Sequence, residues 1–195
     1  MSKVIIPLLI YVAIMAITPG PNNLTCLFLG ARYGKGGAKR FIFGSMVTLF
    51  AKGMMCGFLN LMLANIMPVI MTYLKWFGAA YMLYLAYLMA RSGWEEGSKA
   101  KQSNGDFKDG VLLQFLNAKS YIGVISMFSV YIIPVSTSVW AILAGAAIFV
   151  LFCWIASEIW ALCGTALSKF IEKYKKPFGL LMAAGLVYCA VSAVL

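Results

Sequence analysis

The sequence predicts an all-α integral membrane protein with six transmembrane helices. Of its 195 residues, 63% are hydrophobic and only 11% are charged, whereas a soluble domain carries about 25% charged residues. The apolar residues fall into six runs, and a helix needs roughly 20 such residues to cross a bilayer. These runs cover residues 4–30, 41–64, 68–90, 111–133, 138–166 and 177–195. Because the excess apolar surface must face lipid, a cytosolic enzyme, a nucleic-acid-binding module and a disordered tail are excluded.

The first run begins like a signal peptide, because Lys3 precedes an apolar stretch that ends near the small residues Ala13 and Ala16. The apolar sequence continues well past the position at which such a peptide would be cleaved. We therefore expect an uncleaved span.

This first run is interrupted by the segment Thr18-Pro19-Gly20-Pro21-Asn22-Asn23. The two prolines remove two backbone donors and disfavour the α conformation of the residues before them, and Gly20 adds freedom between them. A helix cannot pass smoothly through such a segment. Irregular backbone at membrane depth is tolerated only where it is buried in protein or lines a watery cavity. The segment is therefore predicted to break the helix and to form a binding site.

The groups at this break suit a zwitterion. A second half-helix that starts near Pro21 would direct free N–H groups and a positive dipole end at a carboxylate. The carbonyls near Ile17 and Thr18 are expected to accept hydrogen bonds from an ammonium group, and Asn22 and Asn23 each add a donor and an acceptor. We expect a small zwitterionic amino acid to bind here. The alternative is a proline kink that serves packing alone.

The fourth run carries the polar residues Gln114, Asn117 and Lys119. Gln114 and Asn117 lie three residues apart, on one face of a helix, and both are included among the candidate substrate-binding residues. The alternative for this pair is hydrogen bonding between helices. Lys119 is expected to extend its ammonium group to the cytoplasmic surface.

The chain is predicted to form a single membrane domain of two three-helix repeats, residues 1–90 and 111–195, joined by a charged cytoplasmic linker at 91–110. The stretch 79–86 (AAYMLYLA) aligns with 183–190 (AAGLVYCA) at an offset of 104 residues. Because each repeat has an odd number of helices, the second must insert upside down relative to the first. Inverted repeats are typical of secondary transporters, which bind substrate near the membrane midplane between the repeats.

Two charged residues, Lys52 and Glu158, lie inside the second and fifth runs. Each costs about 2.5–3.5 kcal/mol at the centre of a membrane helix, so each needs a partner or water. Their separation of 106 residues is close to the repeat offset, and we expect them to meet across the axis that relates the repeats. Glu158 would then be the best candidate for proton coupling, with Lys52 as its partner. The alternative is a static structural pair.

The basic residues other than Lys52 and Lys119 are distributed unevenly between the two faces of the membrane. The three connections between runs one and two, three and four, and five and six hold twelve Lys and Arg residues. The opposite face holds only Lys3 and Lys75. By the positive-inside rule, the three basic connections are cytoplasmic and both termini lie outside.

No metal site, cofactor or disulfide is predicted. The chain has no histidine, and its five cysteines are scattered over the apolar runs without a Cys-x-x-Cys motif. Such cysteines are typical of small buried side chains.

The segments TPGPNN at 18–23 and Leu-Asn-x-Lys at 116–119, the length and the six runs resemble the lysine exporter (LysE/RhtB) superfamily over essentially the whole chain. Among its branches, the chain is most similar to the cysteine/O-acetylserine exporters. The resemblance implies a bacterial inner-membrane exporter of amino acids or close metabolites that is driven by the proton gradient and forms a homodimer. The chain has Ala118 where many members of the superfamily carry proline.

Other classes of membrane protein fit the sequence less well. A membrane enzyme would need a nucleophile–base pair or metal ligands, and only one of the six acids lies well inside a run. A disulfide-passing electron carrier would need paired cysteines on the first and fourth helices, but the fourth has none. A heavy-metal exporter and a passive channel remain open as alternatives.

Overall fold

The computed structural model describes residues 2–92 and 105–194. Within these residues the chain is helical almost throughout and forms no strand, which confirms the predicted all-α class. The helices are α1 (Ser2–Ile17), α2 (Pro21–Gly37), α3 (Lys39–Phe58), α4 (Asn60–Ser92), α5 (Phe107–Leu116), α6 (Ala118–Met127), the π-helical segment η1 (Phe128–Ile132), α7 (Val139–Ala166), α8 (Ser168–Lys173) and α9 (Lys175–Val194).

The described helices reach membrane-spanning length in two ways. The helices α3 and α7 are each long and apolar enough to cross a bilayer by themselves. The pairs α1/α2 and α5/α6–η1 reach this length only when the two helices of each pair are counted together. The two helices are bent by 53° in the first pair and by 66° in the second. The described part of the chain therefore offers two such spans, or up to four if each bent pair counts as one.

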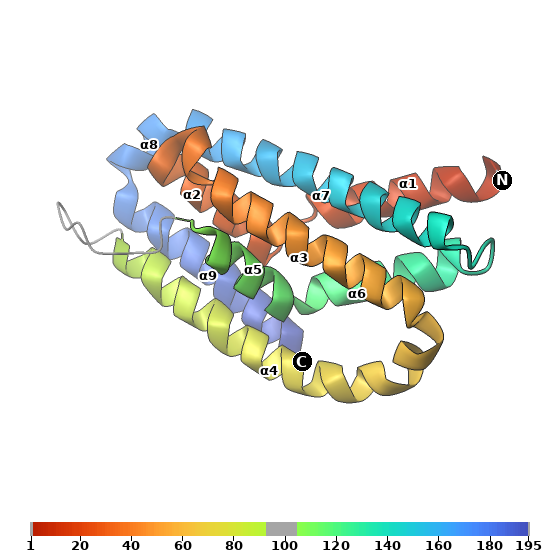
Figure 1. Cartoon of the computed structure of the whole chain (residues 1–195). Coiled ribbons are helices and arrows are strands. Elements are labelled where there is room, and N and C mark those ends of the chain that lie inside the picture. The colour runs from red at the N-terminus through yellow and green to blue at the C-terminus, as the bar shows by residue number, and fades with distance from the viewer. Residues whose placement is uncertain (1, 93–104, 195) are drawn as a thin grey trace.

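The predicted boundary between the second and third runs is wrong. α3 ends at Phe58 and α4 begins at Asn60, so the turn lies at Leu59 and not at residues 65–67. The apolar residues that follow the turn belong to α4, whose 33 residues correspond to about 50 Å of helix. Figure 1 shows that α4 curves in its first half. Most of the linker predicted at 91–110 lies outside the described residues.

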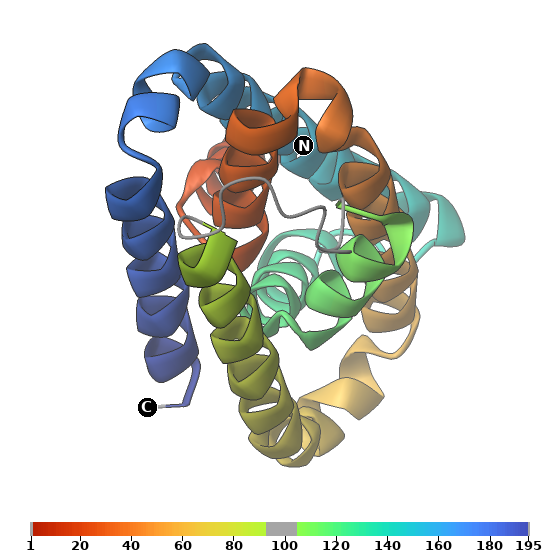
Figure 2. The same ribbon diagram turned by 90° about the vertical axis from the view of Figure 1, so that its left-hand side faces the viewer.

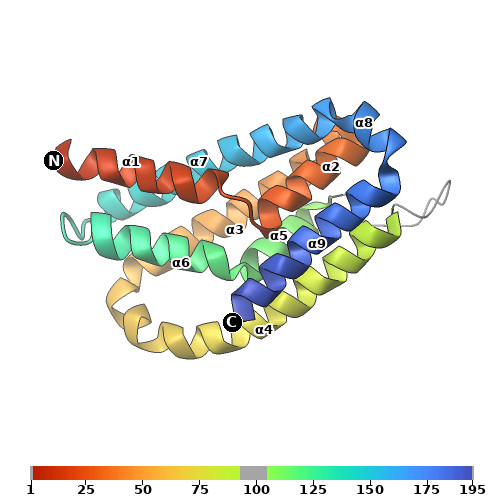
Figure 3. The same cartoon turned by 180° about the vertical axis from the view of Figure 1, so that it is seen from behind.

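Helices from the two halves of the chain alternate in the bundle. α2 packs along α7, α3 packs along α5 and α7, and α4 packs along α9. Figures 1 and 3 show these helices running side by side, and Figure 2 shows them from one end of the molecule. The core is therefore shared between both halves.

Three connections lie at one end of the bundle. They are the turn between α2 and α3, the end of α4 with the start of α5, and the connection from α7 through α8 to α9 (Figure 1). The N-terminus and the connection between η1 and α7 lie at the opposite end (Figure 3). The connections that carry most of the basic residues thus share one end, where Arg40 Nη1 lies 3.9 Å from Asp106 Oδ1.

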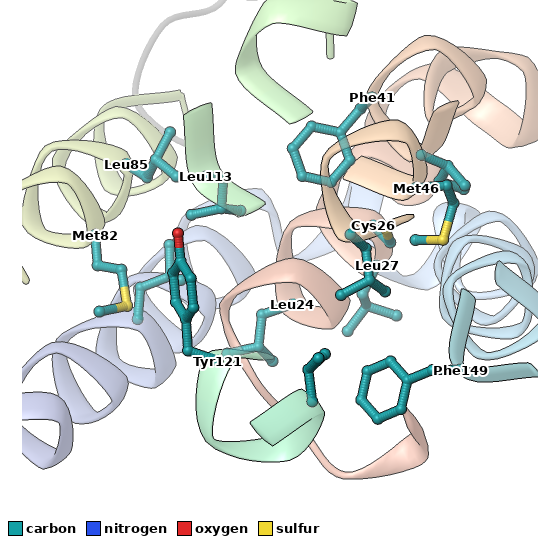
Figure 4. Packing of buried hydrophobic residues seen from close by; sticks show 14 of the residues in the cluster. Leu24, Cys26, Leu27, Phe41, Met46, Met82, Leu85, Leu113, Tyr121 and Phe149 are labelled. Atoms are coloured by element: carbon teal, nitrogen blue, oxygen red, sulfur yellow. The ribbon is translucent and has the colours of Figure 1, made fainter. Parts of the chain in front are cut away.

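The core forms around α2, and the outer surface is strongly apolar. Figure 4 shows core side chains from six helices pointing toward one another: Leu24, Cys26, Leu27, Phe41, Met46, Met82, Leu85, Leu113, Tyr121 and Phe149. On the outside, Trp140 is 80% exposed and Phe77 is 66% exposed. Extended exposed apolar surface of this kind is expected where a protein contacts lipid.

Two pairs of helices touch backbone to backbone through glycines. A Cβ atom added at Gly30 of α2 would lie 2.0 Å from a carbonyl oxygen of α7, and one at Gly164 of α7 would lie 2.0 Å from a carbonyl oxygen of α2. Gly44 of α3 and Gly110 of α5 face each other's helix in the same way, at 2.1 Å and 2.0 Å. Small residues at helix crossings allow such close approach in membrane proteins.

Candidate functional site

The first break separates α1 from α2. α1 ends at Ile17, α2 begins at Pro21, and the two helices are bent by 53°. Gly20 precedes α2 with an extended backbone (φ −163°, ψ 175°), and Pro21 takes the first helical position, where a missing N–H costs little. The first hydrogen bond of α2 runs from the Leu24 amide to the Gly20 carbonyl, at 2.9 Å. The amides of the first turn therefore point out of the helix end.

Side chains bind the carbonyls that α1 leaves free at this break. Asn23 Nδ2 donates to the Ala16 carbonyl at 2.8 Å and to the Thr18 carbonyl at 3.1 Å. Lys119 Nζ, which comes from α6, donates to the same Thr18 carbonyl at 2.7 Å. The end of α1 is therefore tied both to α2 and to the other half of the chain.

These bonds correct two expectations. The Thr18 carbonyl is not open to a ligand ammonium, because its two lone pairs already accept from two donors. The Ile17 carbonyl accepts from Trp160 Nε1 of α7 at 3.2 Å. Lys119 does not extend to the cytoplasmic surface, because its ammonium group is held at the break.

The second break separates α5 from α6. Asn117 stands between the two helices with an extended backbone (φ −78°, ψ 98°). The bend is 66° although neither proline nor glycine stands at the break. Ser120 Oγ donates to the Asn117 carbonyl at 2.7 Å. The first break shows the same feature: Asn23, from the helix that follows the break, also binds backbone carbonyls at that break.

Lys52 of α3 supports this second break. Its side chain is only 3% exposed, and its Nζ donates to the Gln114 carbonyl and, at 2.8 Å, to Ser120 Oγ. The ammonium also lies 3.6 Å from the centre of the Tyr121 ring, which is a cation–π contact. A helix C-terminus, a hydroxyl and an aromatic face therefore surround the charge.

The expected contact between Lys52 and Glu158 is wrong. Both residues lie in the described part of the chain, and no ion pair joins them. Glu158 is half-buried on α7 and accepts a hydrogen bond from Trp154 Nε1 at 3.4 Å. The negative end of the α5 dipole stabilises the Lys52 ammonium in place of a carboxylate.

A pocket lies between the two breaks. Five of the eight residues predicted to bind substrate line it: Gly20, Asn22, Asn23, Gln114 and Asn117. Lys119, Ser120 and Cys153 add polar groups, and Met46 and Phe149 are among the apolar wall residues. The structure therefore brings the two predicted polar segments to one cavity.

The remaining predicted residues lie outside the lining of this pocket. Thr18, Pro19 and Pro21 belong to the first break, where they end α1 and start α2. Lys52 contacts the backbone of Gln114 behind the pocket wall. Glu158 does not line the pocket, although the residue before it contacts Asn22.

Asn22 presents an acceptor without a partner. Its Nδ2 donates to Ser157 Oγ of α7 at 3.0 Å, which fixes the orientation of the amide. Its Oδ1 is buried and has no hydrogen-bond partner in the described part of the chain. Buried acceptors are seldom left in this condition. Asn22 lines the pocket, so this unpaired acceptor belongs to a residue of the pocket wall.

The electrostatic character of the pocket is positive. Lys119 is the only charged residue among the described residues that line it. The N-terminal residues of α2 and α6 also line it, and a helix N-terminus carries about half a positive charge. Such a site favours a negatively charged group such as a carboxylate.

Three residues of the site were missed by the sequence analysis. Ser157 directly precedes Glu158, and this one acid inside the fifth run was the only signal that could have drawn attention to it. Ser120 and Trp160 act through contacts with residues far from them in the sequence, which no local pattern indicates.

A second cavity includes Gly105, which directly precedes the N-cap of α5, among its lining residues. Thr25 and Tyr33 of α2, Phe41 of α3, Tyr81 of α4 and Asp109 of α5 are among its lining residues. Asp109 is the only charged residue among the described residues that line this cavity.

The part of the chain that the structure describes contains no cluster of metal-binding side chains. Within these residues, no group of three or more His, Cys, Asp or Glu side chains could hold a metal ion. The five cysteines are free thiols.

An all-α bundle in which two broken helices meet at a polar pocket has the architecture of a membrane transporter. The chain matches the LysE type translocator family over residues 13–195 and belongs to that family. It is therefore a multi-pass membrane protein that exports solutes, and not an enzyme.

Curated relatives are similar over nearly their whole length. The cysteine/O-acetylserine efflux proteins of Escherichia coli (strain K12) and Shigella flexneri are each 29% identical to this chain over 182 residues, which cover 93% of this chain and 92% of theirs. The protein of the same name from Escherichia coli O6:K15:H31 (strain 536 / UPEC) is 28% identical with the same coverage. No solved structure matches this chain significantly.

Proposed function

We propose that this protein exports small neutral amino acids, or derivatives such as O-acetylserine, across the bacterial inner membrane in exchange for protons. The observation that carries the proposal is the pocket between the two breaks, which presents two helix N-termini and one unpartnered acceptor. Two relatives are named cysteine/O-acetylserine efflux protein, and these names favour a small neutral amino acid as the substrate.

The groups of the pocket suit the two charges of a zwitterion. The carboxylate would accept from the first-turn amides of α2, next to Gly20 and Asn22. The ammonium would donate to Asn22 Oδ1, the buried acceptor that has no partner among the described residues. This assignment replaces the carbonyls of Ile17 and Thr18, which are bound by protein side chains.

We propose six membrane crossings arranged as an inverted repeat. Each bent pair counts as one crossing, and α3, α4, α7 and α9 supply the other four. The packing supports this count, because the broken span of each half contacts the second span of the other half, α2 with α7 and α5 with α3. In the same way, α7 supplies Ser157 to the first break and α3 supplies Lys52 to the second.

The transport path follows from this arrangement. The end with the basic connections would face the cytoplasm, with both termini outside. Substrate would enter through the cavity near Tyr33 and Asp109 and reach the pocket between the breaks. Movement of one half against the other would then open the pocket to the opposite side. The homodimer that the family resemblance implies is part of the same proposal.

Proton coupling is assigned to Glu158 and Lys52 as two separate groups. Glu158 directly follows Ser157, whose hydroxyl holds Asn22 of the pocket. Lys52 holds the carbonyl of Gln114 at the second break. A change in the protonation of Lys52 would reach Gln114 through this hydrogen bond, whereas Glu158 would act on Asn22 through the neighbouring Ser157.

Uptake into inverted membrane vesicles tests the function. Uptake of cysteine, O-acetylserine, threonine, leucine and lysine is compared with and without an imposed proton gradient, and vesicles without the protein serve as the control. Gradient-dependent uptake of a small neutral amino acid is expected. Uptake that ignores the gradient would favour the passive channel. If no amino acid is taken up, the assignment fails and metal cations become the next substrates to test.

A further inference from the structure

We propose that Lys119 recognises the carboxylate of the substrate, and that it exchanges the Thr18 carbonyl for that carboxylate when substrate binds. The proposal rests on the proposed function, because it assigns a residue to the same pocket. It adds a specificity-determining residue and a direct link between substrate binding and the contact that joins the two broken helices.

Lys119 lies where the two breaks meet. It is the second residue of α6 and lines the pocket, while its Nζ donates to the Thr18 carbonyl at the end of α1, at 2.7 Å. A Cβ atom added at Gly20 would lie 3.2 Å from Lys119 Cδ and 3.3 Å from Nζ. The ammonium group therefore lies against the residue that precedes α2, where a carboxylate bound to the first turn of α2 would lie.

The electrostatic surroundings of Lys119 are positive and favour the binding of an anion. Its ammonium lies beside the positive ends of α2 and α6. Lys52 holds two other residues of the same lining, Gln114 and Ser120. Among the described residues that line the pocket there is no acid. The carboxylate of a ligand would supply the negative charge that this cluster of positive groups lacks.

The exchange is favourable for both partners. A hydrogen bond between an ammonium and a carboxylate is charge-assisted at both ends and stronger than one to a neutral carbonyl. The Thr18 carbonyl would not be left unpaired, because it also accepts from Asn23 Nδ2 at 3.1 Å. Substrate binding would therefore release the end of α1 from α6 without creating a buried unsatisfied acceptor.

The test measures ligand protection of Cys153, which lines the same pocket. In a variant that keeps Cys153 as its only cysteine, the rate of alkylation by N-ethylmaleimide is measured with increasing concentrations of three ligands. L-Serine carries both charged groups, ethanolamine lacks the carboxylate, and 3-hydroxypropionate lacks the ammonium. Lys119→Gln and Lys119→Met remove the charge, and Lys108→Gln, at an exposed lysine of α5, is the control.

Serine is expected to protect Cys153 and ethanolamine is not. Lys119→Gln and Lys119→Met should raise the serine concentration needed for protection about 10- to 100-fold, whereas Lys108→Gln should leave it unchanged. If one of the two variants does not fold, the other gives the same comparison. Equal protection by serine and ethanolamine in the parent protein would overturn the proposal, and so would unchanged serine binding in either variant.

The ligand series separates this proposal from the proposed function. If 3-hydroxypropionate protects Cys153 through Lys119 but serine does not, the amino-acid assignment fails and the role of Lys119 stands. If no ligand with a carboxylate protects Cys153, the role of Lys119 is overturned, even if the vesicles export amino acids.

Discussion

Lys52 illustrates how a membrane bundle can hold a buried cation with no acid among its partners in the described part of the chain. Its ammonium contacts the Gln114 carbonyl, the Ser120 hydroxyl and the Tyr121 ring. The Gln114 carbonyl lies in the last turn of α5, where the helix dipole is negative. The sequence marks such a lysine as in need of a partner, but it does not distinguish a carboxylate from a helix end. The expected pairing with Glu158 failed for this reason.

At the same scale, Asn22→Leu tests the free acceptor of the pocket. The change removes Oδ1, which is expected to bind the substrate ammonium, so the apparent affinity in vesicle uptake should fall about 10-fold or more. Ser157→Ala is the matched control, because it removes the partner of Nδ2 but leaves Oδ1 in place. We expect this control to lower affinity much less. Equal losses in the two variants would mean that Asn22 acts only by holding α2 against α7.

Glu158→Gln tests the proton-coupling assignment. The amide keeps an acceptor for Trp154 Nε1 but cannot carry the charge. If Glu158 carries the proton, uptake into inverted vesicles should lose its dependence on the pH gradient. Exchange of substrate across the membrane in the absence of a pH gradient should continue. The measurement is the ratio of uptake with and without the gradient. A ratio equal to that of the parent protein would remove Glu158 from the mechanism and leave Lys52 as the remaining candidate.

At the scale of the elements, the two breaks differ in how visible they are in the sequence. Pro19 and Pro21 mark the place where α1 ends and α2 begins, since proline cannot continue a helix. The break at Asn117 has no such residue, and it depends on contacts made by Lys52 from α3 and by Ser120. Tertiary contacts of this kind cannot be predicted from a local pattern.

The sequence also did not predict where a helix ends when the residues on both sides of the boundary are mostly apolar. The turn at Leu59 lies inside an apolar stretch, and hydropathy reports only that such residues avoid water. The bounds of α7, Val139–Ala166, lie within one residue of the predicted run at 138–166, because Ser138 caps the helix and polar residues flank it. Prediction therefore succeeded where polar residues mark the ends of a span.

The glycine contact between α3 and α5 gives a prediction for stability. A Cβ atom at Gly110 would lie 2.0 Å from the Phe41 carbonyl oxygen, so Gly110→Ala must push the two helices apart. We expect a loss of about 1–3 kcal/mol, measured as a lower midpoint of thermal unfolding in detergent. Gly36→Ala is the control, because no atom lies within 4 Å of its added Cβ. A Gly110→Ala protein as stable as the control would contradict the close packing of these helices.

At the scale of the whole molecule, the two ends of the bundle predict its orientation. Gly36 lies at the end with the basic connections, and Thr137 lies in the connection between η1 and α7 at the other end. In a cysteine-free background, a membrane-impermeant maleimide should label Thr137→Cys from outside the cell. It should label Gly36→Cys only in inverted vesicles. The opposite pattern would place both termini in the cytoplasm.

The paired glycines of α2 with α7 and of α3 with α5 have a consequence for how the chain is made. Each of these contacts joins a helix of the first half to a helix of the second. During synthesis, α2 and α3 leave the ribosome before α5 and α7 exist, so their glycine faces have no partner when they enter the bilayer. The early helices must therefore wait in lipid until more than half of the chain has been translated. A ribosome that stalls after Ser92 would leave behind an unassembled fragment, which membrane quality control would recognise by those same uncovered faces.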